Sequence, residues 1–306
     1  MPARILDGEK IAAAIKAEVA EKVQQLVAAG VRPGLSAVLT ADNTAGAIYI
    51  RGKVRACEAL GIRSETHTPE ASVTTDELLA LVRQLNARED VDGILVQLPL
   101  PPQVDTRRVL AEVDPAKDVD GFHPLNVGLL STRRAALVPC TPAGILEILK
   151  RSGIAIAGAE AVMVGRSNIV GKPAAMLLTN HDATVTLCHS KTRDLAAVCR
   201  RADILVVAVG KPGLITAAHV KPGATVVDVG INRITERAEF EKFFKGDARR
   251  EKTFAEKGAV VMGDVHPEVV NIAGAITPVP GGVGPLTIAM LMVNTVQACR
   301  MRRGGK

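Results

Sequence analysis

Four residues in the first half of the sequence have side chains that suit proton transfer and the binding of a polar ligand. Tyr49 and Lys53 are four positions apart in a stretch with helical periodicity, so both can face one ligand. Gln97 ends an apolar run, where a primary amide needs hydrogen-bond partners. Asp120 lies in a tight turn next to Gly121. Together these types would allow acid–base chemistry at a lysine–carboxylate site.

Most of these residues also have a plainly structural interpretation. Lys53 could be a solvated surface cation, which is the usual place of a helical lysine. Asp118 and Asp120 could only cap their turn, and by pattern alone this interpretation has the larger share. Gln97 is harder to explain in this way, because sites form at the carboxyl ends of buried strands. Spacing alone therefore does not join the four residues into one site.

A second candidate site is the loop between the apolar run Ala161–Val164 and a helix that Pro173 is expected to open. Gly165 and Gly171 stand at the two ends of this loop, where backbone N–H groups can converge on an anion. Ser167 occupies the place of the middle glycine in the usual dinucleotide fingerprint. A plain turn between a strand and a helix is therefore an equally weighted alternative by spacing.

The segment after the next expected strand, Thr184–Cys188, favours a nucleotide and indicates which one. An NAD-binding fold usually places an Asp or Glu there to hold the ribose. The segment His189–Arg193 instead contains Ser190, a lysine and an arginine, and no carboxylate. Together with Arg166, these cationic and hydroxyl groups suit a 2′-phosphate. The sequence therefore predicts NADP as the cofactor.

Strands and helices alternate along the chain, which predicts an α/β fold with parallel sheets. Expected strands are 35–40, 63–68, 93–98, 161–164, 184–188, 204–209, 225–229 and 259–262. Expected helices include 7–30, which opens the chain, one that ends at Leu60, one behind the capping box of Thr74 and Glu77, 142–151, and 286–301. Residues 232–257 read as an exposed excursion with one short helix, and 278–285 as an irregular loop.

Composition limits the classes of protein to which the chain can belong. Its 306 residues are 47% hydrophobic, which favours two domains over one. The net charge of +6 suits an anionic small molecule, whereas one Tyr, five Phe and no Trp argue against nucleic-acid binding. No apolar run is expected to span a membrane. Five cysteines in no metal-ligand or redox spacing indicate reduced thiols of a cytoplasmic protein.

Several segments together closely resemble the bifunctional methylenetetrahydrofolate dehydrogenase/cyclohydrolase family. These segments follow the family order over nearly the whole chain: 49–58, 91–100, 117–122, 139–142, 165–173, 188–192, 227–232 and 278–285. The resemblance implies an N-terminal α/β folate-binding domain at 1–138, on which a C-terminal helix at 286–303 packs back. It also implies a Rossmann-type NADP-binding domain at 139–285, a cleft between the two domains, and a homodimer that pairs through the NADP domains.

The resemblance also implies what the candidate residues do with tetrahydrofolate derivatives. Hydride leaves the bridging methylene for the nicotinamide, and water then opens the resulting methenyl cation to give 10-formyltetrahydrofolate. Lys53 matches the catalytic lysine, which would need a pKa lowered towards neutrality to accept a proton from that water. Gln97 matches the residue that orients the lysine, Asp120 the residue that holds the pterin, and Tyr49 the residue that packs along the folate. Further matches are to substrate contacts at Gly281, Gly282 and Pro285, and to cofactor contacts at Gly165, Arg166, Ser167, Ser190 and Ile231.

The sequence departs from the family pattern in two places. Gly46 stands where many members carry a serine, and the segment 233–258 is longer than usual. Neither departure touches Lys53, Gln97 or Asp120. Two alternative functions are a dehydrogenase without cyclohydrolase activity and an NADP-binding regulator without turnover. A regulator would have no need of all four residues Tyr49, Lys53, Gln97 and Asp120.

Overall fold

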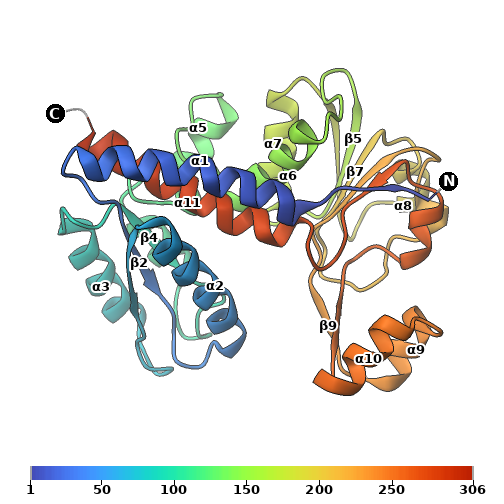
Figure 1. Cartoon of the computed structure of the whole chain (residues 1–306), viewed down its shortest axis with the longest axis horizontal. Coiled ribbons are helices and arrows are strands. Elements are labelled where there is room, and N and C mark those ends of the chain that lie inside the picture. Colours follow the sequence, from blue (N-terminus) through green and yellow to red (C-terminus); the bar gives the residue numbers. More distant parts are fainter. Residues whose placement is uncertain (1, 305–306) are drawn as a thin grey trace. The chain divides into compact units, whose positions relative to one another are not determined.

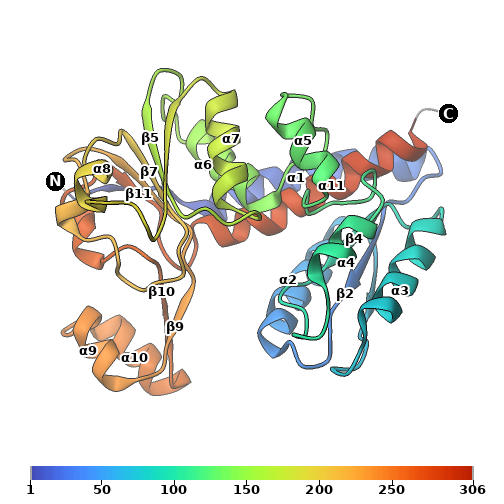
Figure 2. The same cartoon turned by 180° about the vertical axis from the view of Figure 1, so that it is seen from behind.

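The computed structural model describes residues 2–304, and their contacts divide into two compact units (Figures 1 and 2). Unit 1 contains the chain up to Ile11 together with Gly144–Leu286. Unit 2 contains Ala12–Ala143 together with the chain from Thr287 onward. The boundaries fall within three helices, so neither unit is one continuous stretch of sequence: these helices are α1 (Gly8–Ala28), α6 (Cys140–Arg151) and α11 (Val283–Arg303).

Unit 1 is built on a six-stranded sheet in which every pairing is parallel, as the sequence predicts. From edge to edge its strands are β1 (Arg4–Ile5), β11 (Ala275–Ile276), β8 (Thr225–Asp228), β7 (Ile204–Val207), β5 (Glu160–Val164) and β6 (Thr184–Cys188). The central strands are buried along their whole length, because parallel sheets are covered on both faces. Helical segments in this unit include α7 (Gly171–Asn180), α8 (Leu195–Cys199), and two 3₁₀ turns, η1 (Ala217–His219) and η2 (Pro267–Asn271).

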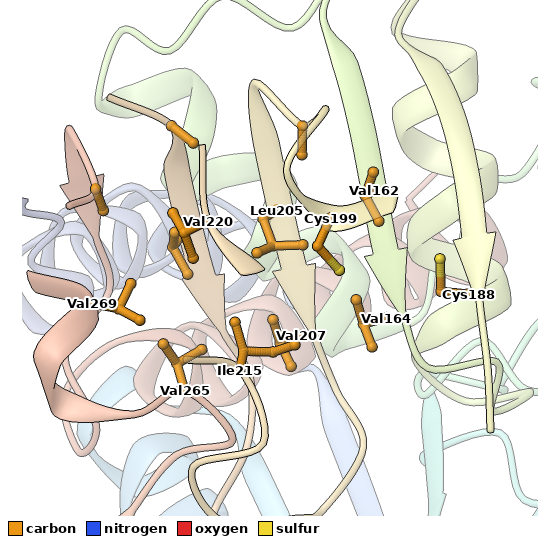
Figure 3. Packing of buried hydrophobic residues seen from close by; sticks show 14 of the residues in the cluster. Val162, Val164, Cys188, Cys199, Leu205, Val207, Ile215, Val220, Val265 and Val269 are labelled. Atoms are coloured by element: carbon orange, nitrogen blue, oxygen red, sulfur yellow. The ribbon is translucent and has the colours of Figure 1, made fainter. Parts of the chain in front are cut away.

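One core cluster of unit 1 lies on a single face of this sheet. Val162, Leu205 and Val207 of the strands belong to one buried cluster with Cys199 and Val269 of the covering segments (Figure 3). Each of these aliphatic side chains that leaves water stabilises the fold by about 1.5–3 kcal/mol. β-Branched residues dominate the strands, and their stiff side chains pack well on a pleated surface.

Unit 2 contains a three-stranded parallel sheet in the order β3 (Arg63–His67), β2 (Gly34–Val38), β4 (Gly93–Val96). Its remaining helices are α2 (Thr44–Leu60), α3 (Thr75–Ala87), α4 (Thr106–Glu112) and α5 (Pro124–Ser131). The predicted capping box at Thr74 and Glu77 is confirmed, and Gly61 ends α2 in the left-handed conformation. Within this unit, the parts of α1 and α11 that belong to it run side by side (Figures 1 and 2).

A buried carboxylate fixes the end of α11 inside unit 2. Asp92 is inaccessible to solvent and accepts hydrogen bonds from the N–H of Gly34 and from Arg302 Nη1, each at 2.9 Å. Arg303 completes the pairing through two of its nitrogens, with Nε at 2.9 Å from Oδ1. A buried carboxylate is tolerated because two cations and a backbone donor compensate its charge.

Three sequence predictions of secondary structure are wrong in detail. The chain does not begin with a helix, because β1 precedes α1 and pairs with β11. The 278–285 segment is not wholly irregular, since α11 begins at Val283. Pro285 is compatible with this start because the N–H groups of the first helical turn have no intrahelical acceptor.

The third error concerns the excursion, which we define as residues 232–262. Its ends form an antiparallel pair of strands, β9 (Asn232–Ile234) and β10 (Val260–Met262). Between them lie two helices rather than one, α9 (Arg237–Phe244) and α10 (Ala248–Lys257). The excursion also has its own small core of Ile234, Phe240, Phe244, Val260 and Met262. Among the described residues, no helix is long and apolar enough to cross a membrane.

Candidate active site

A lysine–amide pair lies at the carboxyl edge of the unit 2 sheet. Lys53 projects from α2, is only 9% exposed, and its Nζ donates to Gln97 Oε1 at 3.0 Å. Gln97 directly follows β4, and its N–H continues the sheet by donating to the Val38 carbonyl at 2.9 Å. Its Nε2 donates to the Leu98 carbonyl at 2.9 Å, which turns Oε1 towards the lysine. The structure thus joins two candidates that spacing alone could not.

Asp120 lies in a turn that its neighbour Asp118 holds in shape. The Asp118 carboxylate accepts from the backbone N–H of Phe122 at 3.2 Å and of His123 at 2.8 Å. Asn126 Nδ2 donates to the same carboxylate at 2.8 Å. The turn-capping interpretation therefore applies to Asp118, and these contacts leave the carboxylate of Asp120 available for another role.

The electrostatics of Asp120 connect it to the lysine. Burial raises the pKa of Asp120 to about 6, the positive charge of Lys53 lowers it, and the negative charge of Asp118 raises it. Burial likewise raises the pKa of the Cys140 thiol, which the charges of Asp120 and Lys53 also influence. The structure thus places Lys53, Asp120 and Cys140 within one electrostatic environment in unit 2.

Asn294 of α11 supports the residue that precedes Asp120, and sequence reasoning missed it. Its Nδ2 donates to the carbonyls of Val119 and Val138, each at 2.8 Å. The Cys140 thiol donates to the same Val119 carbonyl at 3.2 Å. The available signal was an asparagine directly after the apolar run 288–293 of the last helix, because an amide that packs with such a run needs partners.

Lys117 is a second residue whose role the sequence did not reveal. Its Nζ donates to the carbonyls of Leu85, Asn86 and Arg88 at 3.1, 2.6 and 2.7 Å. These carbonyls lie at the end of α3, where the last turn lacks intrahelical donors. Burial lowers the pKa of Lys117 to about 8. This lysine therefore supports the segment before Asp120 rather than facing a ligand.

Tyr49 lies one turn before Lys53 on α2, as its spacing predicts. It is 42% exposed, although the buried part of its environment raises the pKa of the phenol. A large aromatic side chain left half in solvent offers a surface against which a flat ligand can pack.

The nucleotide-type loop of unit 1 follows β5 and leads into α7. Gly165 has φ +123°, and a Cβ there would collide with the Ala208 carbonyl oxygen. A Cβ on Gly171 would in turn collide with the Gly165 carbonyl oxygen. The two glycines therefore permit a close approach of three backbone segments, as in loops that hold phosphates.

Ser167 changes how this loop can bind an anion. Its Oγ accepts from the N–H of Val170 at 3.1 Å and of Gly171 at 3.2 Å. Two donors at the start of α7 are therefore already used within the loop. The hydroxyl proton of Ser167 remains able to donate, so the loop presents a side-chain donor where a glycine-rich loop would present backbone donors.

A pocket of about 310 Å³ in unit 1 brings four predicted cofactor residues together, and Lys211 adds a second cation beside Arg166. The pocket is lined by Val164, Gly165, Arg166, Ser167, His189, Ser190, Leu195, Ala208, Val209, Lys211 and Leu214. None of these described lining residues is a carboxylate, so the pocket suits a phosphate group.

Asp264 shapes one wall of this pocket and was also missed from the sequence. Its carboxylate accepts from the N–H groups of Val209, Gly210 and Lys211 at 2.6–2.9 Å. Asn232 Nδ2 donates to it at 2.9 Å. A fully buried carboxylate thus fixes the segment that carries Lys211.

The remaining predicted residues lie elsewhere in unit 1. Ile231 is 50% exposed and is not among the described residues that line the pocket; its Cδ1 lies 3.9 Å from the place of a Cβ on Gly284. Gly281 and Gly282 belong to the loop before α11, and Pro285 lies in the first turn of that helix. Tyr49, Lys53, Gln97 and Asp120 belong to unit 2.

Comparison with known proteins identifies the relatives of this chain. Residues 6–120 match the family model "Tetrahydrofolate dehydrogenase/cyclohydrolase, catalytic domain", and residues 139–303 match "Tetrahydrofolate dehydrogenase/cyclohydrolase, NAD(P)-binding domain". The chain belongs to the tetrahydrofolate dehydrogenase/cyclohydrolase family. The two matched ranges contain the Lys53–Gln97 pair and the pocket of unit 1, respectively.

Relatives in this tetrahydrofolate dehydrogenase/cyclohydrolase family match over nearly their whole length. The Bifunctional protein FolD of Koribacter versatilis is 66% identical over 304 residues, which are 99% of each chain. The crystal structure of the bifunctional FolD of Campylobacter jejuni is 42% identical, with a TM-score of 0.87 over 98% of this chain and 99% of that chain. A Trypanosoma brucei FolD, complexed with NADP cofactor and inhibitor, is 38% identical, with a TM-score of 0.87 over 98% of each chain.

Proposed function

We propose that this protein oxidises 5,10-methylenetetrahydrofolate with NADP⁺ and hydrolyses the 5,10-methenyl product to 10-formyltetrahydrofolate. The observation that carries the proposal is the partly buried Lys53–Gln97 pair, whose lysine acts electrostatically on Asp120. An amine and a carboxylate in one partly desolvated place suit a reaction that first creates a cation and then adds water to it. Family membership supports both steps.

The lining of the unit 1 pocket suits a phosphate group of NADP⁺, and Arg166, Lys211 and Ser190 would hold the 2′-phosphate. Gly165 and Ser167 would face the nucleotide at the start of α7. When bound, the cofactor supplies the acceptor for the hydride of the bridging methylene. Ile231, which is also proposed to contact the cofactor, would do so outside this pocket.

Lys53 is the proposed general base for hydration of the methenyl cation. Acting as the base, the amine takes one proton of the attacking water as the new carbon–oxygen bond forms. The hydroxyl of this adduct then becomes the formyl carbonyl, and its proton passes to the ring nitrogen whose bond to that carbon breaks. Gln97 acts as the residue that orients the amine, because its Oε1 accepts from Nζ and its Nε2 is already fixed on Leu98. The amide cannot flip without losing one of these two bonds.

Asp120 and Tyr49 are proposed to hold the folate. The carboxylate accepts hydrogen bonds from nitrogen donors of the pterin, and the half-exposed phenol packs along the aromatic part of the substrate. Gly281, Gly282 and Pro285 are proposed to border the folate. Holding the ring aligns the one-carbon bridge for both reactions.

The proposal is tested by assaying methylenetetrahydrofolate with NADP⁺ and NAD⁺ in parallel, while both methenyl and formyl products are followed. We expect formyl product with NADP⁺ preferred. Accumulation of the methenyl compound without ring opening would identify a dehydrogenase alone. Absence of turnover with either cofactor, together with measurable NADP⁺ binding, would favour a binding protein without catalysis.

Arg166→Ala should weaken NADP⁺ binding by about one to two decades and NAD⁺ binding much less. A charge-assisted hydrogen bond to the 2′-phosphate contributes roughly 1.5–3 kcal/mol, and NAD⁺ lacks that group. Titration calorimetry of both cofactors measures the difference. An equal loss for the two would mean that the phosphate lies elsewhere.

The chain is further proposed to form a cytoplasmic homodimer through unit 1. β6 is an edge strand of the sheet, and Leu187 on it and Ile169 beside α7 are each 37% exposed, which supports pairing there. Five buried free thiols support a reducing compartment. Light scattering should give twice the mass of the chain, and the mass of one chain would contradict the dimer.

A further inference from the structure

The excursion, residues 232–262, packs against the rest of unit 1 through Phe243. The ring of Phe243 lies against Gly213, where an added Cβ would come within 2.5 Å of ring carbon Cε1. The same ring meets His266 edge to face, with centroids 5.7 Å apart. Within the excursion the rings of Phe240 and Phe254 pack at a tilt, with centroids 4.9 Å apart. Because these contacts hold α9 and α10 in place, a side chain on α10 projects from a fixed position.

Arg250 of α10 connects this base to the loop between β11 and α11. Its Nη1 donates to the Val261 carbonyl at 2.8 Å, and its Nη2 donates to the Val279 carbonyl at 3.2 Å. The guanidinium carbon lies 4.2 Å from the centre of the Phe244 ring. Asp247 Oδ2 lies 3.6 Å from Nε. One planar group thus joins a strand of the excursion to the loop, which a lysine ammonium could not do in the same geometry.

The loop is otherwise held at its two ends. Before it, Thr277 Oγ1 lies 2.8 Å from the N–H of Asp228, from which it accepts a hydrogen bond. Towards α11, the Gly282 carbonyl lies so close to Gly8 that a Cβ on Gly8 would collide with it. Between these points Val279 follows Pro278, and Gly281 adopts φ +100°. Arg250 is the side chain that holds the loop in its middle, where the peptide groups must be oriented.

We propose that Arg250 is a positioning residue that fixes the Pro278–Gly282 loop in the conformation that receives the folate. This inference rests on the proposed function, in which Gly281 and Gly282 border the substrate. Without the guanidinium, the loop would occupy several conformations. The apparent affinity for folate would then fall in proportion to the fraction in the receptive one. The excursion would thereby influence a reaction to which none of its side chains contributes chemically.

The test compares Arg250→Met and Arg250→Lys with the matched control Arg237→Met. Arg237 also lies against a phenylalanine of the excursion, 5.1 Å from the Phe240 ring, and pairs with Glu241 and Glu251. It therefore stabilises the excursion without reaching the loop. Hydrogen exchange of the amides of Val279 and of residues 281–284, the KM for methylenetetrahydrofolate and the Kd for NADP⁺ are measured on the full-length protein.

We expect Arg250→Met to accelerate hydrogen exchange in the loop. It should also raise the folate KM about tenfold, because the variant loses a hydrogen bond from a charged donor to the loop. The Kd for NADP⁺ should stay unchanged, and Arg250→Lys should fall between wild type and Arg250→Met. Arg237→Met should leave loop exchange and KM unchanged. Equal effects of Arg237→Met and Arg250→Met would overturn the inference, as would unchanged loop exchange in Arg250→Met. If Arg250→Met exchanges faster in the loop but the wild-type protein shows no folate turnover, the proposed function is refuted, whereas the role of Arg250 in fixing the loop is not.

Discussion

Lys53→Met should abolish ring opening of methenyltetrahydrofolate while dehydrogenation falls less. Methionine keeps the apolar stem but removes the amine that faces Gln97. Loss of a general base typically costs about two to four decades in rate. Hydride transfer depends on alignment by many contacts, so part of it should survive. The variant should therefore accumulate the methenyl compound, which absorbs in the near ultraviolet.

Arg55→Met provides the matched control, because Arg55 is an exposed cation on the same helix. It should leave both rates near those of the wild type. Ring opening at the wild-type rate in Lys53→Met would exclude the lysine as the base. An equal loss of both activities would mean that Lys53 mainly holds the substrate.

Asp120→Asn should reduce both activities together, because both need the folate held. The substitution keeps the shape but exchanges one acceptor oxygen for a donor, which then faces the donors of the pterin. Removing one side of a buried charged contact costs roughly 2–5 kcal/mol, so we expect a rise of about 1.5 to 3.5 decades in the folate KM. Unchanged folate affinity would make Asp120 a turn residue only.

The same carboxylate predicts a pH dependence. Burial raises the pKa of Asp120 to about 6 in the folded protein, so the carboxylate is ionised above that pH and protonated below it. Because the ionised form is the better acceptor, the folate KM should rise as the pH falls through about 6. Asp120→Asn has no such titration, and its KM should stay flat over this interval. A wild-type KM that does not change there would contradict the assignment.

Local signals in the sequence predicted the elements that depend on neighbouring residues. The capping box of Thr74 and Glu77 and the left-handed Gly61 are complete within a few residues, so their helix ends could be placed. β1 could not be predicted, because two residues form a strand only by pairing with Ala275 and Ile276 far along the chain. The second helix of the excursion was missed because α10 consists mostly of charged residues, contains few apolar ones and buries none of them.

In the candidate site, too, the sequence indicated the residues themselves but not the distant residues that hold them. Side-chain type and family resemblance singled out Lys53, Gln97 and Asp120. The residues that hold them are distant in sequence: Asn294 reaches Val119, and Asp264 reaches Val209 to Lys211. No periodicity connects such partners, because their pairing is decided by how the chain packs. Ser167 occupies a glycine position of the usual fingerprint, and its hydrogen bonds to two N–H groups at the start of α7 follow from the folded loop rather than from that position.

The interleaving of the two units has a consequence for the order of events during synthesis on the ribosome. β1 leaves the ribosome early but must wait for β11, about 270 residues later, before it can pair. Asp92 must likewise wait for Arg302 and Arg303, close to the end of the chain. Neither unit can therefore complete its native contacts while translation is under way. A nascent chain stalled before α11 would retain an uncompensated carboxylate in one unit, and one stalled before β11 an unpaired strand in the other.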